Sequence, residues 1–151
     1  MNVQSPITAM PMSAPSDYYD MTRVRPEVAA ALAKINELGP VFASRAKAVD
    51  DEASFPTANY KDLADAGFLG LSIPEEFGGW GFSMGEYAMV GAEIAKYCGA
   101  TALTFNMHNS SMAWSRFMYD MPNLTPEEKA EFAPLRARQF TRAMKERAIY
   151  S

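Results

Sequence analysis

The chain has 151 residues, of which 48% are hydrophobic and 21% are charged, and its formal net charge is −4. This length suits one domain with a single hydrophobic core, and a net acidic chain is a poor general binder of nucleic acid or of anionic membranes. The sequence has one cysteine, Cys98, and one histidine, His108. It therefore excludes an intramolecular disulfide framework and any metal site built from several cysteines or histidines.

Residues 1–24 are expected to form a disordered tail. They mix Pro, Ser, Met and Asp without a sustained apolar run, and no arginine occurs before Arg23. A secretory signal needs a basic start and an apolar stretch, and a transit peptide is rich in arginine and poor in acids, so neither is predicted. No segment approaches about 18 consecutive apolar residues. We therefore expect no membrane span and a cytoplasmic protein.

Apolar residues recur at steps of three and four from Pro26 onwards, which predicts a helix. Proline suits the first helical turn, where its missing N–H has no partner to lose. Gly39-Pro40 interrupts the pattern, because Pro40 cannot donate to the carbonyl of Asn36 and its ring clashes with that group. The pattern keeps its phase across the break, so we expect one kinked helix or two nearly collinear ones. The predicted inward positions are Val28, Leu32, Ile35, Leu38, Phe42, Ala46 and Val49.

A second, shorter helix is predicted from Thr57 to Gly67. Glycine often ends helices because it readily adopts the left-handed conformation. The following run, FLGLSIPEEFGGWGFS, is apolar at first and then rich in proline and glycine. This composition predicts a buried connection followed by a tight turn, with Trp80 and Phe82 packed beneath it. The inward face of the short helix should comprise Tyr60, Leu63 and Ala64.

A third helix is predicted from the capping box of Ser83 and Glu86, in which each residue bonds to the backbone of the other. Glycine in mid-helix costs roughly 1 kcal/mol against alanine. We therefore expect another backbone to approach closely at Gly91. The helix should end at Gly99. Its inward stripe should comprise Tyr87, Val90, Ile94 and Cys98.

A fourth helix is predicted over residues 101–119, and a second capping box at 125–128 opens a fifth. Pro134 should divide this last helix from a segment over 135–147. No alternating strand pattern appears until the last few residues. The predicted fold class is therefore all-α, an irregular helical bundle over residues 25–146.

The predicted helix over residues 101–119 carries the most informative pattern. Its only charged residue before Asp120 is Arg116, so we expect burial on most of its sides. Yet it also carries a polar stripe, and buried polar groups must find hydrogen-bond partners or cost about 1–3 kcal/mol each. The stripe could face a ligand cavity or bond to neighbouring backbone in a dry interface, and both alternatives stay open. The stripe comprises Thr104, His108, Ser111 and Ser115, with Asn106 and Asn109 beside it.

The other chemically versatile side chains indicate structural roles. His108 is interpreted as a core histidine with satisfied hydrogen bonds, because no cysteine or serine nucleophile stands at a recognisable spacing. Glu75 and Glu76, in a loop of proline and glycine, are expected to be solvated, and Cys98 to be a small core residue. A solvated face, with anion binding as the alternative, is predicted for the basic residues of the last helix: Arg136, Arg138, Arg142, Lys145 and Arg147.

Three segments resemble, in their order and spacing, the N-terminal helical domain of the acyl-CoA dehydrogenase family. They are ASRAKAVDDEASFP, ADAGFLGLSIPEEFGGWG and EYAMVGAEIAKYCGATALTFNMH, and a looser likeness extends through TPEEK to the end. The resemblance implies a flavoprotein with an N-terminal α-domain, a middle β-domain and a C-terminal four-helix bundle, in which FAD lies mainly between the latter two. It also implies the reaction: a glutamate of the C-terminal bundle removes the α-proton of an acyl-CoA thioester. A hydride then passes from the β-carbon to the flavin, and electrons leave through electron-transfer flavoprotein.

The resemblance places residues 147–151 at the start of a middle β-domain, so the flavin-binding segments and the base would lie outside this chain. No catalytic or cofactor-binding residue is therefore assigned, and FAD is expected in the complete enzyme but not on this chain alone. The implied partners are the remaining flavin-binding domains or subunit, acyl-CoA and electron-transfer flavoprotein, with a homo-oligomer when complete. In the family the fourth helix lies near the substrate cavity. The candidate pocket-lining residues are thus Phe105, His108, Asn109 and Ser111.

Three functions follow as hypotheses. The first is the N-terminal α-domain of an FAD-dependent acyl-CoA dehydrogenase-like oxidoreductase, which contributes a pocket wall and a partner surface. The second is part of a flavin-dependent monooxygenase of the same fold, which the polar stripe favours. The third is a non-catalytic interaction module that kept only the helical domain.

Overall fold

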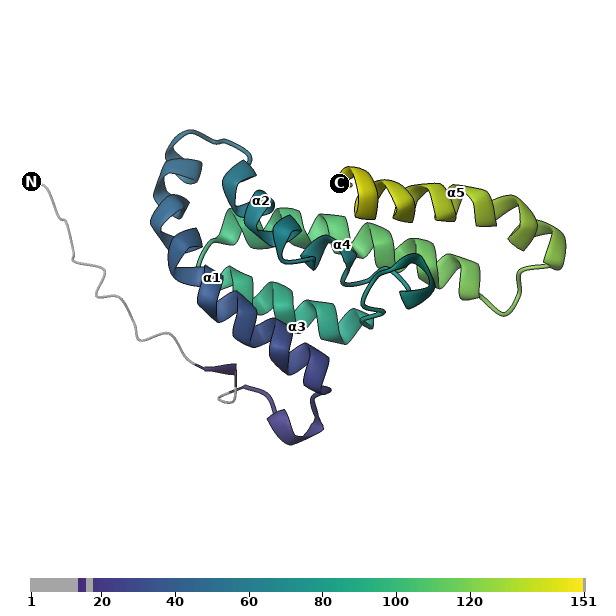
Figure 1. Cartoon of the computed structure of the whole chain (residues 1–151), viewed down its shortest axis with the longest axis horizontal. Helices are drawn as coiled ribbons and strands as arrows, with labels where there is room; N and C mark the ends of the chain where they lie inside the picture. The colour runs from purple at the N-terminus through teal and green to yellow at the C-terminus, as the bar shows by residue number, and fades with distance from the viewer. Residues whose placement is uncertain (1–13, 16–17, 151) are drawn as a thin grey trace, which may run out of the picture.

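The computed structural model describes residues 14–15 and 18–150, whose regular elements are all helical (Figure 1). No strand occurs among these residues, so the predicted all-α fold is confirmed. None of the helices in this part is long and apolar enough to cross a membrane. The α-helices are α1 (Pro26–Asp51), α2 (Thr57–Asp65), α3 (Met84–Ala95), α4 (Gly99–Asp120) and α5 (Pro126–Glu146). Single 3-10 turns precede α1 and connect α2 to α3: η2 (Met21–Arg23), η3 (Phe68–Gly70) and η4 (Glu75–Phe77).

Helix α1 runs without interruption through Pro40, so the alternative of two separate helices is wrong. Pro40 is exposed, whereas Ile35 and Phe42 on either side of it are fully buried. Burying one large apolar side chain stabilises a protein by about 1.5–3 kcal/mol. Several such residues along α1 thus offset the roughly 3 kcal/mol that a proline costs inside a helix.

The main core lies where α1, α3 and α4 pack together (Figure 1). The predicted inward stripes of α1 and α3 supply much of it. The reason expected for Gly91 is wrong, because a Cβ there would meet the ring of Phe105 at 3.9 Å and no backbone within that distance. Glycine at this position therefore leaves room beside an aromatic side chain. The fully buried members of this core include Val28, Leu32, Ile35, Phe42, Val90, Ile94 and Phe105.

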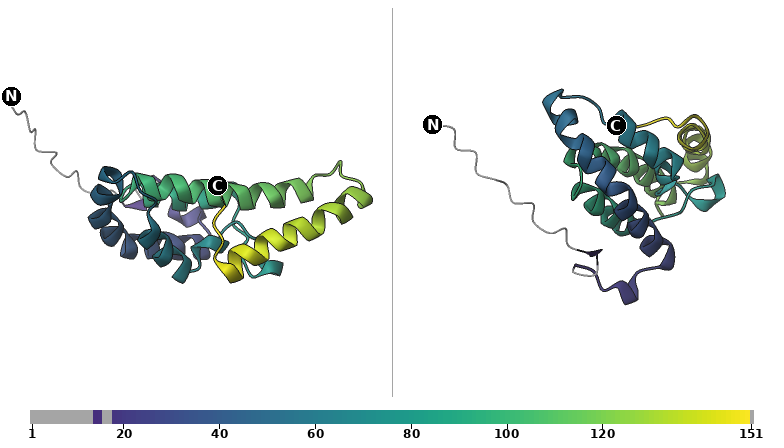
Figure 2. Two further views of the ribbon diagram at one scale, coloured as in Figure 1. Left: turned by 90° about the horizontal axis from the view of Figure 1, so that it is seen from above. Right: turned by 60° about the vertical axis from the view of Figure 1, so that its left-hand side comes forward.

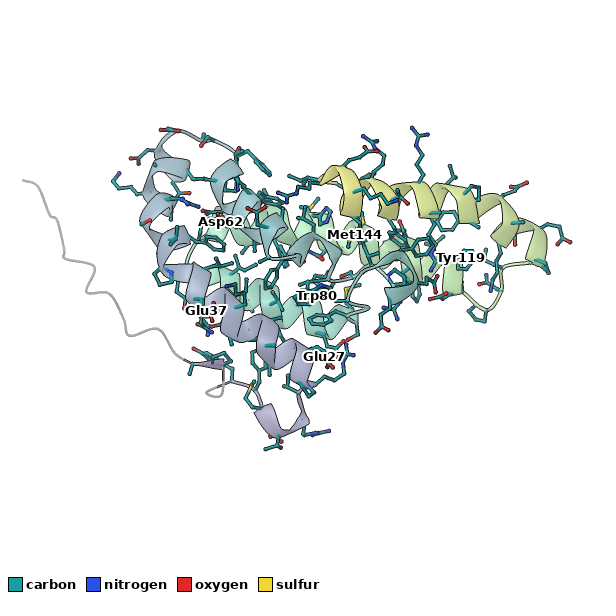
Figure 3. All side chains as sticks on the ribbon, in the orientation of Figure 1. Glu27, Glu37, Asp62, Trp80, Tyr119 and Met144 are labelled. Atoms are coloured by element: carbon teal, nitrogen blue, oxygen red, sulfur yellow. The ribbon has the colours of Figure 1, made fainter. Side chains whose placement is uncertain are left out.

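The segment between α2 and α3 is a loop that folds back on itself. Gly67, with a φ of 83°, caps the end of α2 in the left-handed conformation, as predicted. The amide of Trp80 donates to the carbonyl of Gly70 at 3.0 Å, which closes the loop. The ring of Trp80, labelled in Figure 3, lies 5.5 Å from that of Phe68 and 5.6 Å from that of Phe82. The predicted packing beneath the glycine turn is confirmed.

Two helix boundaries differ from the prediction. Gly99 does not end α3, which stops at Ala95, but is the first residue of α4. The short turn between them is closed by the amide of Cys98, which donates to the carbonyl of Ile94 at 3.1 Å. Pro134 does not divide α5, because it lies on the exposed side of the helix while the buried side continues past it.

Helix α5 packs beside α4, at a distance from α1 (Figure 2). Its buried side chains meet α4 and the loop before α3. Together, side chains of α5, α4 and this loop form a second, smaller core whose members are Ile73, Met112, Phe140 and Ala143.

The tail predicted for residues 1–24 lies largely outside the described residues, which omit 1–13 and 16–17. Its last few residues are folded, because Met21 and Val24 pack against the main core. The helical domain therefore begins slightly earlier than predicted.

The segment after α5 forms no strand in residues 147–150, and position 151 lies outside the described part. Arg147 ends the helix in the left-handed conformation, with a φ of 53°. The assignment of this segment to a β-domain stays a prediction.

Replacing Gly39 by alanine is expected to destabilise the domain, because the new Cβ would lie 2.3 Å from the ring of Tyr97. The ring is held in place, since its hydroxyl donates to Asn36 Oδ1 at 2.6 Å. Overpacking of this kind costs roughly 1–3 kcal/mol. The control, Gly85→Ala, meets nothing within 4 Å and should leave stability unchanged or raise it by up to about 1 kcal/mol. Urea unfolding followed by circular dichroism compares the two variants, and equal stabilities would contradict the packing described.

Acid should weaken the ion pair between Arg25 and Glu86. Arg25 Nε lies 2.6 Å from Glu86 Oε1, and this guanidinium lowers the pKa of Glu86 from 4.5 to about 2. Because the folded state favours the ionised form of Glu86, the ion pair stabilises the fold fully above pH 4.5. This stabilisation is lost as the pH falls towards 2. Glu86→Gln should therefore flatten the pH dependence of the urea midpoint in this interval. An unchanged dependence would show that the pair contributes nothing.

Candidate functional site

The four predicted pocket residues all lie on α4, but they do not share one surface. Phe105, His108 and Asn109 are fully buried, whereas Ser111 is partly exposed. Phe105 belongs to the main core between α3 and α4. The structure therefore places three of the four candidates inside the domain and one at its edge.

His108 is held between two backbone groups. Its Nε2 lies 2.9 Å from the carbonyl oxygen of Leu69, and its Nδ1 lies 3.2 Å from the amide nitrogen of Tyr150. An amide N–H can only donate, so Nδ1 accepts and Nε2 carries the proton donated to Leu69. Burial lowers the pKa of His108 below its ordinary value of 6.5, while the Leu69 carbonyl opposes this shift. The interpretation of His108 as a satisfied core histidine is confirmed.

The neighbouring polar residues of α4 bond within their own helix. Asn109 Nδ2 donates to the carbonyl of Phe105 at 3.2 Å, and Ser111 Oγ donates to that of Met107 at 3.0 Å. Asn109 Oδ1 is an exception, because it is buried without a hydrogen-bond partner among the described residues. This bonding favours the dry interface over the ligand cavity as the environment of the polar stripe.

The opposite side of α4 carries four exposed large apolar side chains, so the predicted burial on most sides is wrong. Leu103, Met107, Trp114 and Phe117 are 66%, 43%, 58% and 54% exposed, and their spacing puts them on one face. The rings of Trp114 and Phe117 lie 5.7 Å apart. We call these four residues the outer stripe. The scarcity of charge in α4 thus reflects an apolar outer face as well as a buried inner one, and such faces mark interaction surfaces.

A hollow of about 400 Å³ opens beside the C-terminal part of the outer stripe, next to the start of α3. Arg116 borders it, and its Nη1 donates to the carbonyl of Gly81 at 3.0 Å. Most of the other walls are apolar, so the hollow suits an apolar group. Its lining residues, among which none of the four pocket candidates occurs, are Phe82, Ser83, Met84, Ala113, Trp114, Arg116, Phe117 and Asp120.

The N-termini of α3 and α5 do not fit the diphosphate of the FAD implied by the resemblance. At α3, Glu86 Oε2 accepts from the amide of Ser83 at 2.7 Å, and at α5 Glu128 Oε2 accepts from that of Thr125 at 2.8 Å. Each N-terminus thus already holds a carboxylate, which would repel a phosphate. In the described part of the chain, no cluster of three or more His, Cys, Asp or Glu side chains could hold a metal ion.

Arg136 is buried, although the sequence predicted that it lies on a solvated basic face. It is 7% exposed, and its guanidinium carbon lies 4.2 Å from the ring centroid of Tyr119, labelled in Figure 3. The rings of Phe77 and Phe140 lie at 5.0 and 5.5 Å, and Nη2 donates to Glu76 at 3.0 Å. Cation–π contacts and this ion pair compensate for the lost hydration. No sequence signal marks the cluster, because its members come from three separate elements.

The other basic residues predicted for that face are exposed, as expected: Arg138, Arg142, Lys145 and Arg147.

A buried carboxylate on α3 was also missed. Glu93 is 1% exposed and pairs with Lys96 at 2.6 Å. The i,i+3 spacing of the two residues in an apolar helix is the signal that could have indicated this pair.

The comparison of the sequence with protein families identifies the domain. The family described as acyl-CoA dehydrogenase, N-terminal domain, matches residues 23–135, which span α1 to α4 and the first part of α5. The chain belongs to the acyl-CoA dehydrogenase family.

Three similar proteins illustrate the match. A cyclohex-1-ene-1-carbonyl-CoA dehydrogenase of Syntrophus aciditrophicus is 43% identical over 62 residues, 41% of this chain and 15% of that protein. An acryloyl-CoA reductase (NADH) of Anaerotignum propionicum is 39% identical over 72 residues, 48% of this chain and 17% of that protein. The human mitochondrial short-chain specific acyl-CoA dehydrogenase is 36% identical over 74 residues, 49% of this chain and 17% of that protein. The aligned segments thus span only a small part of these relatives.

Replacing Trp114 by glutamine is expected to reduce the binding of an apolar fluorescent dye. It should change the free energy of unfolding by less than about 0.5 kcal/mol, because the side chain is 58% exposed. The matched control is Trp80→Gln, which removes a ring packed on Phe68 and Phe82 and should cost more than about 1 kcal/mol. Dye titration and urea unfolding measure both variants. Unchanged dye binding by the Trp114 variant would contradict the interpretation of the outer stripe as an accessible apolar surface.

Proposed function

We propose that this chain is the N-terminal α-domain of an FAD-dependent acyl-CoA dehydrogenase-like oxidoreductase, which in its complete form desaturates the α,β-bond of acyl-CoA thioesters. The observation that carries the proposal is the family match over residues 23–135, which includes the helices of the main core. The names of all three relatives described above contain a CoA-linked compound or the words acyl-CoA. A CoA thioester is therefore the substrate class we assign.

Within such an enzyme, α4 would supply part of the acyl-pocket wall. The outer stripe and the hollow of about 400 Å³ offer an apolar surface, and an acyl chain is apolar. Ser111 lies at the edge of this surface. Phe105, His108 and Asn109 would act from behind it, since they are buried on the inner side of the same helix and fix its position. All four residues shape the wall, and none is assigned a catalytic role.

The proposed partners are the remaining flavin-binding domains or a separate flavin-binding subunit. An exposed apolar face of this length is normally covered in a stable assembly. FAD and the catalytic base are assigned to those parts by the resemblance, and the carboxylate-capped N-termini of α3 and α5 agree with this because they do not fit a diphosphate. Electron-transfer flavoprotein as the electron acceptor, a homo-oligomeric complete enzyme and a cytoplasmic location belong to the same proposal.

A non-catalytic interaction module is the second candidate, because the outer stripe would serve a protein partner equally well. The monooxygenase hypothesis depended on a polar stripe facing a cavity. His108, Asn109 and Ser111 bond within the domain, so their polarity no longer favours an oxygenase.

The proposal is tested on the protein purified from its natural source, by its visible absorption spectrum and its intact mass. The expected result is a flavin spectrum that bleaches when an acyl-CoA thioester is added without oxygen. The flavin should accompany either a chain longer than this one or a complex with a second polypeptide.

The other outcomes decide between the alternatives. A colourless protein with the 16.6 kDa mass of this chain, purified without a flavoprotein partner, would contradict the enzymatic proposal and favour the interaction module. Oxygen incorporation into a substrate, in place of thioester desaturation, would assign the chain to a monooxygenase.

A further inference from the structure

The chain that follows α5 turns back and is fastened to α4 at His108. After Arg147 ends the helix, the amide of Ala148 donates to the carbonyl of Arg142 at 3.1 Å. The last described residues then cross from the end of α5 towards α4 (Figure 2, left). There the amide of Tyr150 donates to His108 Nδ1 at 3.2 Å, and the two rings lie 6.3 Å apart. One imidazole thus holds the end of this segment.

The same ring also holds the loop before α3, because its Nε2 donates to the carbonyl of Leu69 at 2.9 Å. Only the neutral ring with its proton on Nε2 can make both bonds. A second proton would sit on Nδ1 and point at the N–H of Tyr150, so that one donor would face another. The ring is fully buried, and solvent therefore cannot relieve this conflict while the segment stays in place.

We propose that His108 is a proton-operated latch for the segment 149–150: the neutral ring fastens the segment to α4, and protonation releases it. The inference uses only contacts within the domain, so it stands or falls separately from the proposed enzymatic function.

The charged groups near the latch are paired with one another. On α2, Asp65 bonds to Lys61 at 2.7 Å and to Arg147 at 2.6 Å, and on α5, Arg142 bonds to Glu146 at 2.9 Å. Lys61 and Arg147 lower the pKa of Asp65, which keeps its charge when His108 titrates. The ion pair of Arg147 therefore persists, and this residue remains as the pivot about which the segment moves.

The turn η3 and the phenol of Tyr60 contribute no charge. The turn η3, which contains Leu69, has no titratable side chain. On α2, burial raises the pKa of Tyr60 to about 12, so its phenol stays neutral. Burial lowers the pKa of His108 from 6.5. The docked segment is therefore fully favoured above pH 6.5 and loses stability as the pH falls below it.

Release of the segment would open the space between it and α2. A hollow of about 210 Å³ lies there, and two of its walls, Arg147 and Ile149, belong to the moving part or its pivot. The latch thus couples the protonation of one buried ring to the exposure of this hollow and to the path of the chain after α5.

The test follows two signals of the same sample from about pH 8 downwards until the ring has gained its second proton, which extends below the interval of about pH 8 to 5 in which histidine normally titrates. The first is the ring ¹⁵N spectrum, which is unambiguous because the chain has one histidine. The second is the hydrogen-exchange protection of the Tyr150 amide. At high pH we expect a neutral ring protonated at Nε2 and a protected amide. As the ring gains its second proton, the protection should fall about tenfold, the ratio that corresponds to one ordinary hydrogen bond.

Two substitutions of His108 test its two hydrogen bonds one at a time. His108→Asn keeps an oxygen acceptor near the position of Nδ1 but cannot titrate, so the protection of Tyr150 should persist to acid pH. His108→Gln keeps a donor that reaches towards Leu69 but lacks the acceptor, so Tyr150 should be unprotected at every pH. The amide of Ala148, which bonds to α5, is the internal control and should stay protected throughout.

The proposal is overturned if the ring takes up a proton while Tyr150 keeps its protection. It is also overturned if Tyr150 loses its protection while the ring is still neutral, or if the wild type and His108→Asn lose it at the same pH. The first two outcomes are read on the wild-type chain, so a variant that fails to fold does not prevent the decision.

Discussion

The burial of one face of α4 is the constraint on which the rest of the structure depends. This helix contacts α1, α3, α5 and η3, and it places Phe105 in the main core and Met112 in the smaller one. Since one helix supplies side chains to both cores, α5 is held in relation to α1 chiefly through it. Truncating a large buried side chain costs roughly 2–5 kcal/mol. That is a large share of the 5–15 kcal/mol by which small domains are typically stable, so the packing of this face decides whether the bundle forms.

Some polar residues of this face, such as Thr101 and His108, have partners in other segments. Asn59 Nδ2 donates to Thr101 Oγ1 at 2.8 Å, and Arg45 donates to Asn59 Oδ1 at 2.9 Å and to Asp62 at 2.7 Å. These bonds join α1, α2 and α4. A buried polar group without a hydrogen-bond partner destabilises a fold by about 1–3 kcal/mol. Asn109 Oδ1 is such a group among the described residues, and the surrounding packing offsets its cost. A buried polar stripe thus indicates specific helix pairing as readily as a ligand site.

Features encoded in a few adjacent residues were predictable from the sequence, whereas features that depend on a neighbouring element were not. The capping boxes at Ser83 and Thr125 and the left-handed Gly67 occur as predicted, because each needs only its own local backbone. Pro134 was misread, since a proline on the solvent side of a packed helix is tolerated and its sequence neighbours do not reveal that side. The same limit applies to Arg136, whose burial requires aromatic rings from distant parts of the chain.

The candidate site shows this limit most clearly, because an uncharged helix looks the same in sequence whether its apolar residues are buried or exposed. The sequence identified α4 correctly but could not assign directions to its side chains. His108 faces inward, towards Leu69 and Tyr150, while Met107 and Trp114 lie on the outer stripe. Helical geometry puts these two faces on different sides of one rigid rod. Any change that shifts α4 from its inner side must therefore move the outer stripe with it.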